Sequence, residues 1–277
     1  MGNIYNYFRT WAKAKECFKK SNYKSSQSHY LENLLYLQEE KEFYNLYKEL
    51  NDQGFTDPLI GSLISHSNNL FDKNNVNSFC NNSLDYIHIS KVEEEDLSEA
   101  SLMDIISFND INSHSYRSQS LLYNGSQSAG NIFLYNHPSI QDIKKCIEIK
   151  IEEYREYFSF KNEGFLKNWP NNYDLFGWIV KMKKGGYLES HIHKEGWLSG
   201  SFYINIPRKN NNINEGNIVF SDMGPRYPVK DKHKYKRKII ELSTRSICIF
   251  PSCIFHETIP FDTKEDRITL AFDIMPK

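Results

Sequence analysis

The sequence predicts an α+β protein, in which a helical amino-terminal region precedes a half that is rich in β-strands. Apolar residues recur every three or four positions through residues 8–72 and again through 139–158, which is the spacing of amphipathic helices. From residue 176 the pattern changes to short apolar segments that turn residues separate, which is typical of strands. The change of period divides the chain into two regions.

Four short helices are predicted in the amino-terminal region. Their apolar stripes lie within residues 11–18, 31–37, 43–50 and 60–71. The fourth begins after Asp57-Pro58, where a capping residue is followed by proline. Short helices joined by tight turns indicate antiparallel pairs of the tetratricopeptide kind, although a plain helical cap fits the same pattern. The polar run at 72–78 predicts a linker, so we expect a helical, tetratricopeptide-like region at 1–78.

Short strands are predicted mainly after the amphipathic helix at 139–158, with two more before it. The strand segments are 176–182, 198–207, 216–221, 238–242, 245–251 and 267–274, with a further pair near 119–123 and 131–135. Many short strands without intervening helices predict an antiparallel barrel or a double-sheet jelly roll. This second domain is expected at 83–277, an ordinary size for one domain.

Charge and composition argue against several functional classes. The 34 basic and 35 acidic side chains leave a net charge of −1, so no global field attracts nucleic acid or an anionic membrane. The apolar stretches are shorter than the about 20 residues of a membrane-spanning helix, and the amino terminus lacks a secretory signal. The five cysteines include no CxxC pair, which argues against a zinc ribbon or a disulfide framework. We therefore expect a cytoplasmic protein without nucleic-acid or membrane partners; its oligomeric state is not indicated.

Three histidines form a candidate metal site. His191 and His193 are two residues apart in an extended segment, so their side chains point to the same side. His256 follows an apolar strand segment 65 residues after His191, where a facing strand of a jelly roll returns. Imidazoles suit iron, and a facial set of two or three leaves positions open for oxygen and a chelating substrate.

Arg267 opens the last predicted strand and is a candidate anion-binding residue. The strand is apolar after it, so a guanidinium that points inward needs a buried anionic partner. A planar guanidinium binds a carboxylate through two hydrogen bonds, and Thr269 faces the same way with a hydroxyl group. These residues predict a site for a bound diacid. No partner can be assigned to Asp273 in the same segment.

The motifs together resemble a known family. The similar segments are SHIHKEGWLSGSFYINIP, EGNIVFSD, ICIFPSCIFHETIPF, RITLAFDIMP and, upstream, QSLLYNGSQSAGNIF. They are similar to the 2-oxoglutarate- and iron(II)-dependent oxygenases that are often attached to tetratricopeptide repeats, over about residues 83–277. The resemblance implies a double-stranded β-helix (jelly-roll) oxygenase domain that uses Fe(II), 2-oxoglutarate and O2, with ascorbate as an expected stimulant.

The resemblance also implies roles for single residues. His191 and His256 are expected to bind iron. Arg267 is expected to bind the distal carboxylate of 2-oxoglutarate beside Thr269, and Tyr203 lies where related oxygenases often place a second donor to that carboxylate.

The third iron ligand stays open between two residues. The broader superfamily has His-x-Asp or His-x-Glu, whereas this chain has His191-Ile192-His193. His193 therefore replaces the carboxylate, or Glu195 supplies it in a shifted motif that begins at His193. We favour His193, because it aligns better with the strand that follows.

Three further residues are expected near the substrate. Gln127 and Asn131 lie in the upstream block of the resemblance, at a turn beside the site, and Trp197 is expected in the core or the pocket wall.

The expected function is hydroxylation of a C–H bond in a peptide, a protein or a small molecule. One alternative is a three-histidine cupin-type dioxygenase that needs no 2-oxoglutarate, and another is a non-catalytic jelly-roll interaction protein. An inward Arg267 favours the 2-oxoglutarate-dependent hydroxylase over the cupin-type dioxygenase. The presence of both Arg267 and the histidines argues against a non-catalytic interaction protein. The sequence does not identify the substrate.

Overall fold

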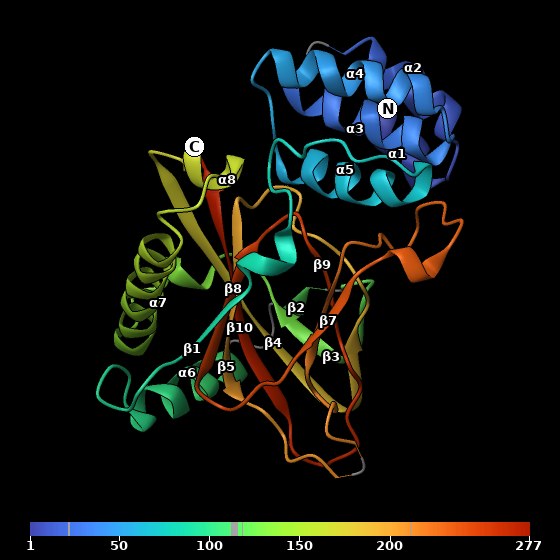
Figure 1. The fold of residues 1–277 in the computed structure, drawn as a ribbon. Helices are drawn as coiled ribbons and strands as arrows, with labels where there is room; N and C mark the ends of the chain where they lie inside the picture. Colours follow the sequence, from blue (N-terminus) through green and yellow to red (C-terminus); the bar gives the residue numbers. More distant parts are fainter. Residues whose placement is uncertain (22, 112–115, 118, 211) are drawn as a thin grey trace.

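Five helices open the fold of the computed structural model, which describes residues 1–21, 23–111, 116–117, 119–210 and 212–277. They are α1 (Gly2–Tyr7), α2 (Trp11–Lys19), α3 (Lys24–Tyr36), α4 (Glu40–Asp52) and α5 (Pro58–Phe71). The four predicted helices are confirmed, and they gather at one end of the β-sheets (Figure 1). The sequence did not indicate α1, because that helix has six residues and buries only Gly2, so it has no apolar stripe.

Two antiparallel sheets follow among the described residues. Their strands are β1 (His88–Lys91), β2 (Tyr116–Arg117), β3 (Leu122–Ser128), β4 (Tyr173–Leu188), β5 (Leu198–Asn205), β6 (Ile218–Ser221), β7 (Arg237–Ile240), β8 (Ser246–Pro251), β9 (Phe255–Thr258) and β10 (Arg267–Pro276). One sheet has the order β1-β8-β5-β10-β4-β3-β2 and the other the order β7-β6-β9. The helical elements in this part of the chain are η1 (Ser83–Tyr86), α6 (Glu99–Ile111), η3 (Ile132–Leu134), α7 (Pro138–Tyr157), α8 (Gly164–Lys167) and η4 (Lys232–Lys234). The fold is α+β with a jelly roll, as predicted.

One strand prediction is wrong, and one strand was not predicted. The segment 131–135 is not a strand: it forms η3, and the Asn131 side chain accepts a hydrogen bond from the Phe133 amide at 3.1 Å, which caps that turn. His256 follows the predicted strand β8, as expected, and it also lies within a further strand, β9, opposite Phe220 of β6. The four-residue β9 was missed because one short segment shows too little alternation to indicate a strand.

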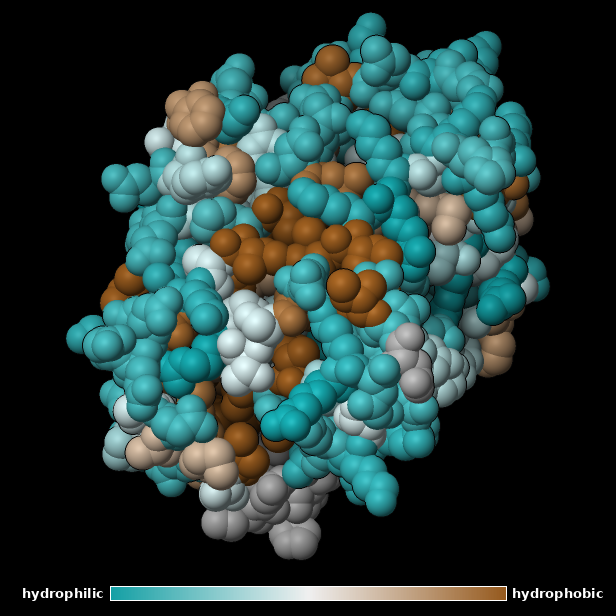
Figure 2. All heavy atoms as spheres, turned by 60° about the horizontal axis from the view of Figure 1, so that its bottom comes forward, coloured by the Kyte–Doolittle hydropathy of each residue, from teal (hydrophilic) through white to brown (hydrophobic). Residues whose placement is uncertain are grey.

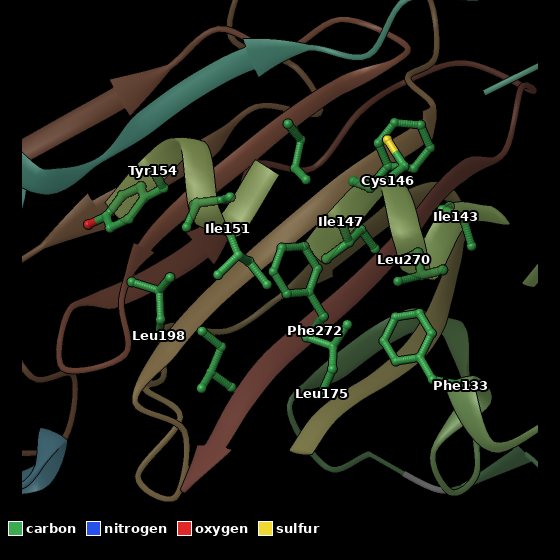
Figure 3. Packing of buried hydrophobic residues seen from close by; sticks show 14 of the residues in the cluster. Phe133, Ile143, Cys146, Ile147, Ile151, Tyr154, Leu175, Leu198, Leu270 and Phe272 are labelled. Atoms are coloured by element: carbon green, nitrogen blue, oxygen red, sulfur yellow. The ribbon is translucent and has the colours of Figure 1, made fainter. Parts of the chain in front are cut away.

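The long helix α7 covers one face of the larger sheet (Figure 1). Ile143, Ile147 and Ile151 on this helix pack with Leu270 and Phe272 of β10 in one buried cluster (Figure 3). Alternate residues of a strand point to opposite faces, so the even-numbered residues of β10 face α7. Its odd-numbered residues from Arg267 to Asp273 line a cavity on the other face.

Helix α5 joins the amino-terminal helices to the jelly roll. It buries 11 of its 14 residues, as expected for a helix that is covered on several sides. A Cβ atom at Gly61 would lie 2.9 Å from the Cβ of Phe79 and 3.0 Å from that of Cys253, so only glycine permits this approach. The buried His66 accepts a hydrogen bond from the Gly224 amide at 3.0 Å and donates one to the Pro228 carbonyl at 2.9 Å. The domain division at 1–78 and 83–277 and the tetratricopeptide-like assignment stay predictions.

An ion pair between the buried Glu32 and the partly exposed Lys194 also joins the two regions. Glu32 on α3 is 4 % exposed, and its Oε1 atom lies 2.8 Å from Lys194 Nζ and 2.8 Å from the Tyr227 hydroxyl. Burial alone would raise the pKa of Glu32, but Lys194 and His29 outweigh it and lower the pKa to about 2. The carboxylate is therefore charged at neutral pH and holds α3 to the jelly roll.

The face of the molecule in Figure 2 is mostly hydrophilic. On this face, apolar side chains gather in a central patch that hydrophilic residues surround (Figure 2). Among the described helices, none combines the length and the apolar character that a membrane crossing requires.

Replacing Ile147 by alanine tests the packing of α7. Ile147 is 1 % exposed, so Ile147→Ala should lower the free energy of unfolding by about 2–5 kcal/mol through lost burial and a residual cavity. Urea unfolding measures this change. Ile149 on the same helix is 50 % exposed, so Ile149→Ala should have little effect, and equal losses in both variants would contradict the packing described.

Replacing Glu32 by glutamine tests the ion pair and its pH dependence. We expect Glu32→Gln to lower the free energy of unfolding at pH 7 by about 1–2 kcal/mol, because the charge-assisted contacts to the partly exposed Lys194 and to the Tyr227 hydroxyl weaken. The folded pKa of Glu32, about 2, lies below its ordinary value of 4.5. The stabilisation is therefore complete above pH 4.5 and is lost as the pH falls through about 2.

Urea unfolding at several acidic pH values and at pH 7 measures this dependence. The difference between wild type and Glu32→Gln should shrink toward low pH. Glu49→Gln, which changes an exposed residue of α4, should show no difference at any pH. A loss in Glu32→Gln that does not depend on pH would mean that packing, not charge, stabilises this contact.

Candidate functional site

Three histidine side chains meet at the edge between the two sheets. His191 and His256 form a β-bridge, with backbone hydrogen bonds of 3.1 and 2.9 Å. His193 lies two residues after His191 and faces the same way. One ring nitrogen of each histidine lies within 4.8 Å of the other two, so the structure brings together the three residues that the sequence predicted.

The hydrogen bonds of the rings fix their orientation. The Nδ1 atoms of His191 and His256 lie 2.8 Å from the Glu189 carbonyl and 3.2 Å from the Ile254 carbonyl. A carbonyl oxygen only accepts, so both Nδ1 atoms donate and both Nε2 atoms are free to bind a metal. The Nε2 atoms of His191 and His193 lie 3.2 Å apart. The donor set therefore fits a divalent cation with an affinity for nitrogen ligands.

Burial keeps two of these imidazoles neutral. It lowers the pKa of His191 to about 4, and the neighbouring His193 adds to the effect. Burial, together with His191 and His193, lowers the pKa of His256 well below its ordinary value. Metal binding requires neutral imidazole, so His191 and His256 are ready to bind at pH 7 without losing a proton.

A carboxylate orients the third histidine. His193 Nδ1 lies 2.7 Å from Asp273 Oδ1, and the Ser199 hydroxyl donates to the same oxygen at 2.6 Å. An ionised carboxylate only accepts, so His193 donates through Nδ1, as the other two histidines do. Such a partner holds the ring of a metal ligand in place. The sequence analysis found no partner for Asp273; its even spacing from Arg267 along β10 was the available signal.

Arg267 is buried without an anion beside it. It is 3 % exposed, and it donates to the Gly216 carbonyl at 3.0 Å and to the Thr269 hydroxyl at 2.9 Å. Its guanidinium lies 5.2 Å from the centre of the Tyr203 ring, and the buried Tyr203 hydroxyl makes no hydrogen bond within the described residues. Among the residues that the structure describes, no carboxylate lies within 4.0 Å of Arg267. A buried cation and an unused hydroxyl next to it indicate a site for an anionic ligand.

One cavity of about 560 Å3 connects the histidines with Arg267. Alternate residues of β4 and β10 line it, and they include Val180, Met182 and Ala271. Gln127 also lines this cavity, as expected from the sequence. Glu195 lies at its exposed mouth and outside the group of three ligand atoms.

Two residues expected near the substrate lie elsewhere. The side-chain amide of Asn131 donates through its nitrogen to the Leu175 carbonyl at 2.9 Å and accepts through its oxygen from the Gly177 backbone amide at 3.0 Å. The Trp197 indole donates to the Phe165 carbonyl at 2.8 Å and packs against the core. Neither residue lines the cavity as described, so this placement does not support their expected contact with substrate.

The segment that carries His191 and His193 has a second face. Ile192 packs against the core of the helical region and Lys194 forms the ion pair with Glu32, while both residues also border the cavity of the histidines. The amino-terminal helices therefore support the back of the histidine segment.

The chain was compared with known proteins. No curated protein matches the chain. Among solved structures, a Pseudomonas putida prolyl-4-hydroxylase is 10 % identical and aligns over 69 % of this chain and 92 % of its own, with a TM-score of 0.47. A prolyl hydroxylase from Trichoplax adhaerens, solved with a peptide fragment of hypoxia-inducible factor, is 15 % identical over 70 % and 86 %, with a TM-score of 0.44. The epimerase SnoN from nogalamycin biosynthesis is 10 % identical over 70 % and 80 %, with a TM-score of 0.47.

Because these identities and TM-scores are low, the substrates of these proteins cannot be assigned to this chain. The family comparison is more specific: the model of the family described as "putative 2OG-Fe(II) oxygenase" matches residues 177–273. The matched segment contains the three histidines, Arg267 and Asp273. The chain therefore carries, in residues 177–273, a domain of the 2OG-Fe(II) oxygenase family.

Proposed function

We propose that this protein uses Fe(II), 2-oxoglutarate and O2 to hydroxylate a C–H bond of its substrate. One observation carries the proposal: a cluster of three imidazoles and a buried guanidinium without an anion share one cavity. Nitrogen ligands of this kind suit Fe(II), and the guanidinium suits the far carboxylate of a bound diacid.

His191, His193 and His256 would hold the iron through their Nε2 atoms. Asp273 would keep His193 in the orientation and tautomer that metal binding needs. We favour His193 over Glu195 because the His193 ring faces the other two histidines, whereas Glu195 is exposed at the cavity mouth.

Arg267 would bind the distal carboxylate of 2-oxoglutarate, with the hydroxyls of Thr269 and Tyr203 as further donors. Bound iron, 2-oxoglutarate and O2 would together supply the oxidising chemistry, and ascorbate is an expected stimulant. The apolar walls at Val180 and Met182 would exclude water from the reacting atoms.

A second function remains consistent with the ligand set. A cupin-type dioxygenase that needs no 2-oxoglutarate would also use three neutral histidines. The buried Arg267 disfavours it, because that reaction provides no diacid to neutralise the guanidinium. The direct test is aerobic incubation with Fe(II), ascorbate and 2-oxoglutarate while succinate is measured; iron-dependent succinate is expected, and its absence would favour the second function.

Single histidine variants test the metal ligands. After anaerobic loading with Fe(II), or with Zn, Ni or Mn as a stand-in, metal content should fall to near background in His191→Ala, His193→Ala and His256→Ala. Glu195→Ala should keep most of its metal, as should the control His233→Ala, which changes an exposed histidine. If Glu195→Ala loses metal while His193→Ala keeps it, Glu195 is the third ligand.

Arginine variants test the cosubstrate site. Arg267→Ala should raise the apparent constant for 2-oxoglutarate tens to hundreds of times, since a desolvated charge-assisted contact contributes about 2–4 kcal/mol. Arg267→Lys should recover only part of this loss, because an ammonium cannot present the planar fork. Metal content should stay near wild type, which also shows that the variant folds. Arg208→Ala, a change on an exposed loop, is the control; unchanged 2-oxoglutarate dependence in Arg267→Ala would refute the cosubstrate role.

A further inference from the structure

A second cavity, of about 810 Å3, lies where the amino-terminal helices meet the jelly roll. Its lining includes Arg9 and Trp11 near the start of α2, Tyr36 at the end of α3, and Arg226 and Tyr227 in the loop after β6. We call this cavity the seam groove.

The seam groove adjoins the cavity of the histidines. Lys194 lines both of them. Ser120 lines the seam groove, whereas its neighbours Gln119 and Leu121 line the histidine cavity. A molecule in one cavity therefore comes directly beside the other.

The seam groove carries unbalanced positive charge. Its lining has three cations, Arg9, Lys194 and Arg226, and one anion, Glu32. Glu32 is already paired with Lys194 at 2.8 Å. Arg226 is exposed and lies 3.9 Å from Glu189, a long surface contact, and Arg9 is exposed without an ion pair in the described part of the chain. Two guanidinium groups are thus available to a ligand.

An aromatic wall stands beside these two arginines. The rings of Trp11 and Tyr36 stack at 3.9 Å, and Tyr227 meets Tyr36 edge-on at 5.0 Å. Tyr36 lines the same groove as Arg9 and Arg226; burial and Glu32 raise the pKa of Tyr36, while Arg226 and Arg9 oppose this rise. Because the rings pack against one another, they present one apolar surface beside the two arginines.

We propose that the seam groove binds an acidic segment of a peptide substrate while a neighbouring residue of the same peptide enters the histidine cavity. This inference rests on the proposed oxygenase function. Each cavity alone is the size of a small-ligand site, so a molecule that fills both must be extended, as a peptide is. Carboxylate side chains complement Arg9 and Arg226, and flanking apolar atoms complement the aromatic wall.

Immobilised degenerate peptides test this inference on the full chain. Two fixed positions carry glutamate in one pool, glutamine in a second and lysine in a third. The protein is loaded with Zn(II) and 2-oxoglutarate, so that no turnover consumes the peptides. We expect about tenfold more protein on the glutamate pool than on the glutamine pool, with less on the lysine pool.

Matched variants connect this retention to the seam groove. Arg9→Gln combined with Arg226→Gln should remove the preference for glutamate. Arg155→Gln combined with Arg208→Gln removes the same charge from surfaces outside both cavities and should keep the preference. Metal content and the thermal unfolding midpoint of both double variants are measured to show that they fold.

Three outcomes would overturn the inference: no preference for glutamate, equal loss of preference in both double variants, or release of the glutamate pool by millimolar succinate. The last outcome would make the seam groove a site for small dicarboxylates. Failure of the proposed function is seen separately, as an absence of iron-dependent succinate formation by the wild-type protein.

Discussion

The alternation of side chains along β10 is the constraint on which the rest of this structure depends. Ile268, Leu270, Phe272 and Ile274 face α7 and enter the main core, while Arg267, Thr269, Ala271 and Asp273 face the cavity. A shift of one residue in register would exchange the two sets and place a guanidinium and a carboxylate in the core. The apolar packing of α7 therefore fixes the position of the polar groups on the opposite face. Stability and the geometry of the site come from the same strand.

Two buried charged side chains, Glu32 and Arg267, differ in whether an opposite charge lies beside them. Glu32 is balanced by Lys194 and bonded to Tyr227, so it joins the helices to the jelly roll. Arg267 is equally buried but has only neutral partners in the described residues. A buried cation without an anion lowers stability unless a ligand supplies the missing charge. The unbalanced charge is thus a property of the candidate binding site, whereas the balanced pair holds the two regions together.

The histidine segment connects these two parts of the molecule. His191 and His193 face the cavity, and Ile192 and Lys194 face the helices. The amino-terminal helices therefore contact the reverse side of the candidate metal site, and the seam groove opens beside it. A helical region that both supports the histidines and lines an adjoining groove can influence how an extended substrate reaches the site. This arrangement differs from that of a cap that only shields apolar surface.

The sequence by itself determined the helical and strand-rich halves, most strands, the three histidines and Arg267. These features depend on local period and residue type, which a linear pattern contains. It could not determine that 131–135 is a capped turn, because that depends on the Asn131 side chain reaching across to β4. Only the tertiary structure showed that Asp273 holds His193, that Lys194 pairs with Glu32 and that Arg9 lies near Arg226. These pairs of residues are 80, 162 and 217 positions apart in the chain; the first two pairs are in contact, and the two arginines line one cavity. The packing of distant segments, which no local pattern encodes, brings each pair together.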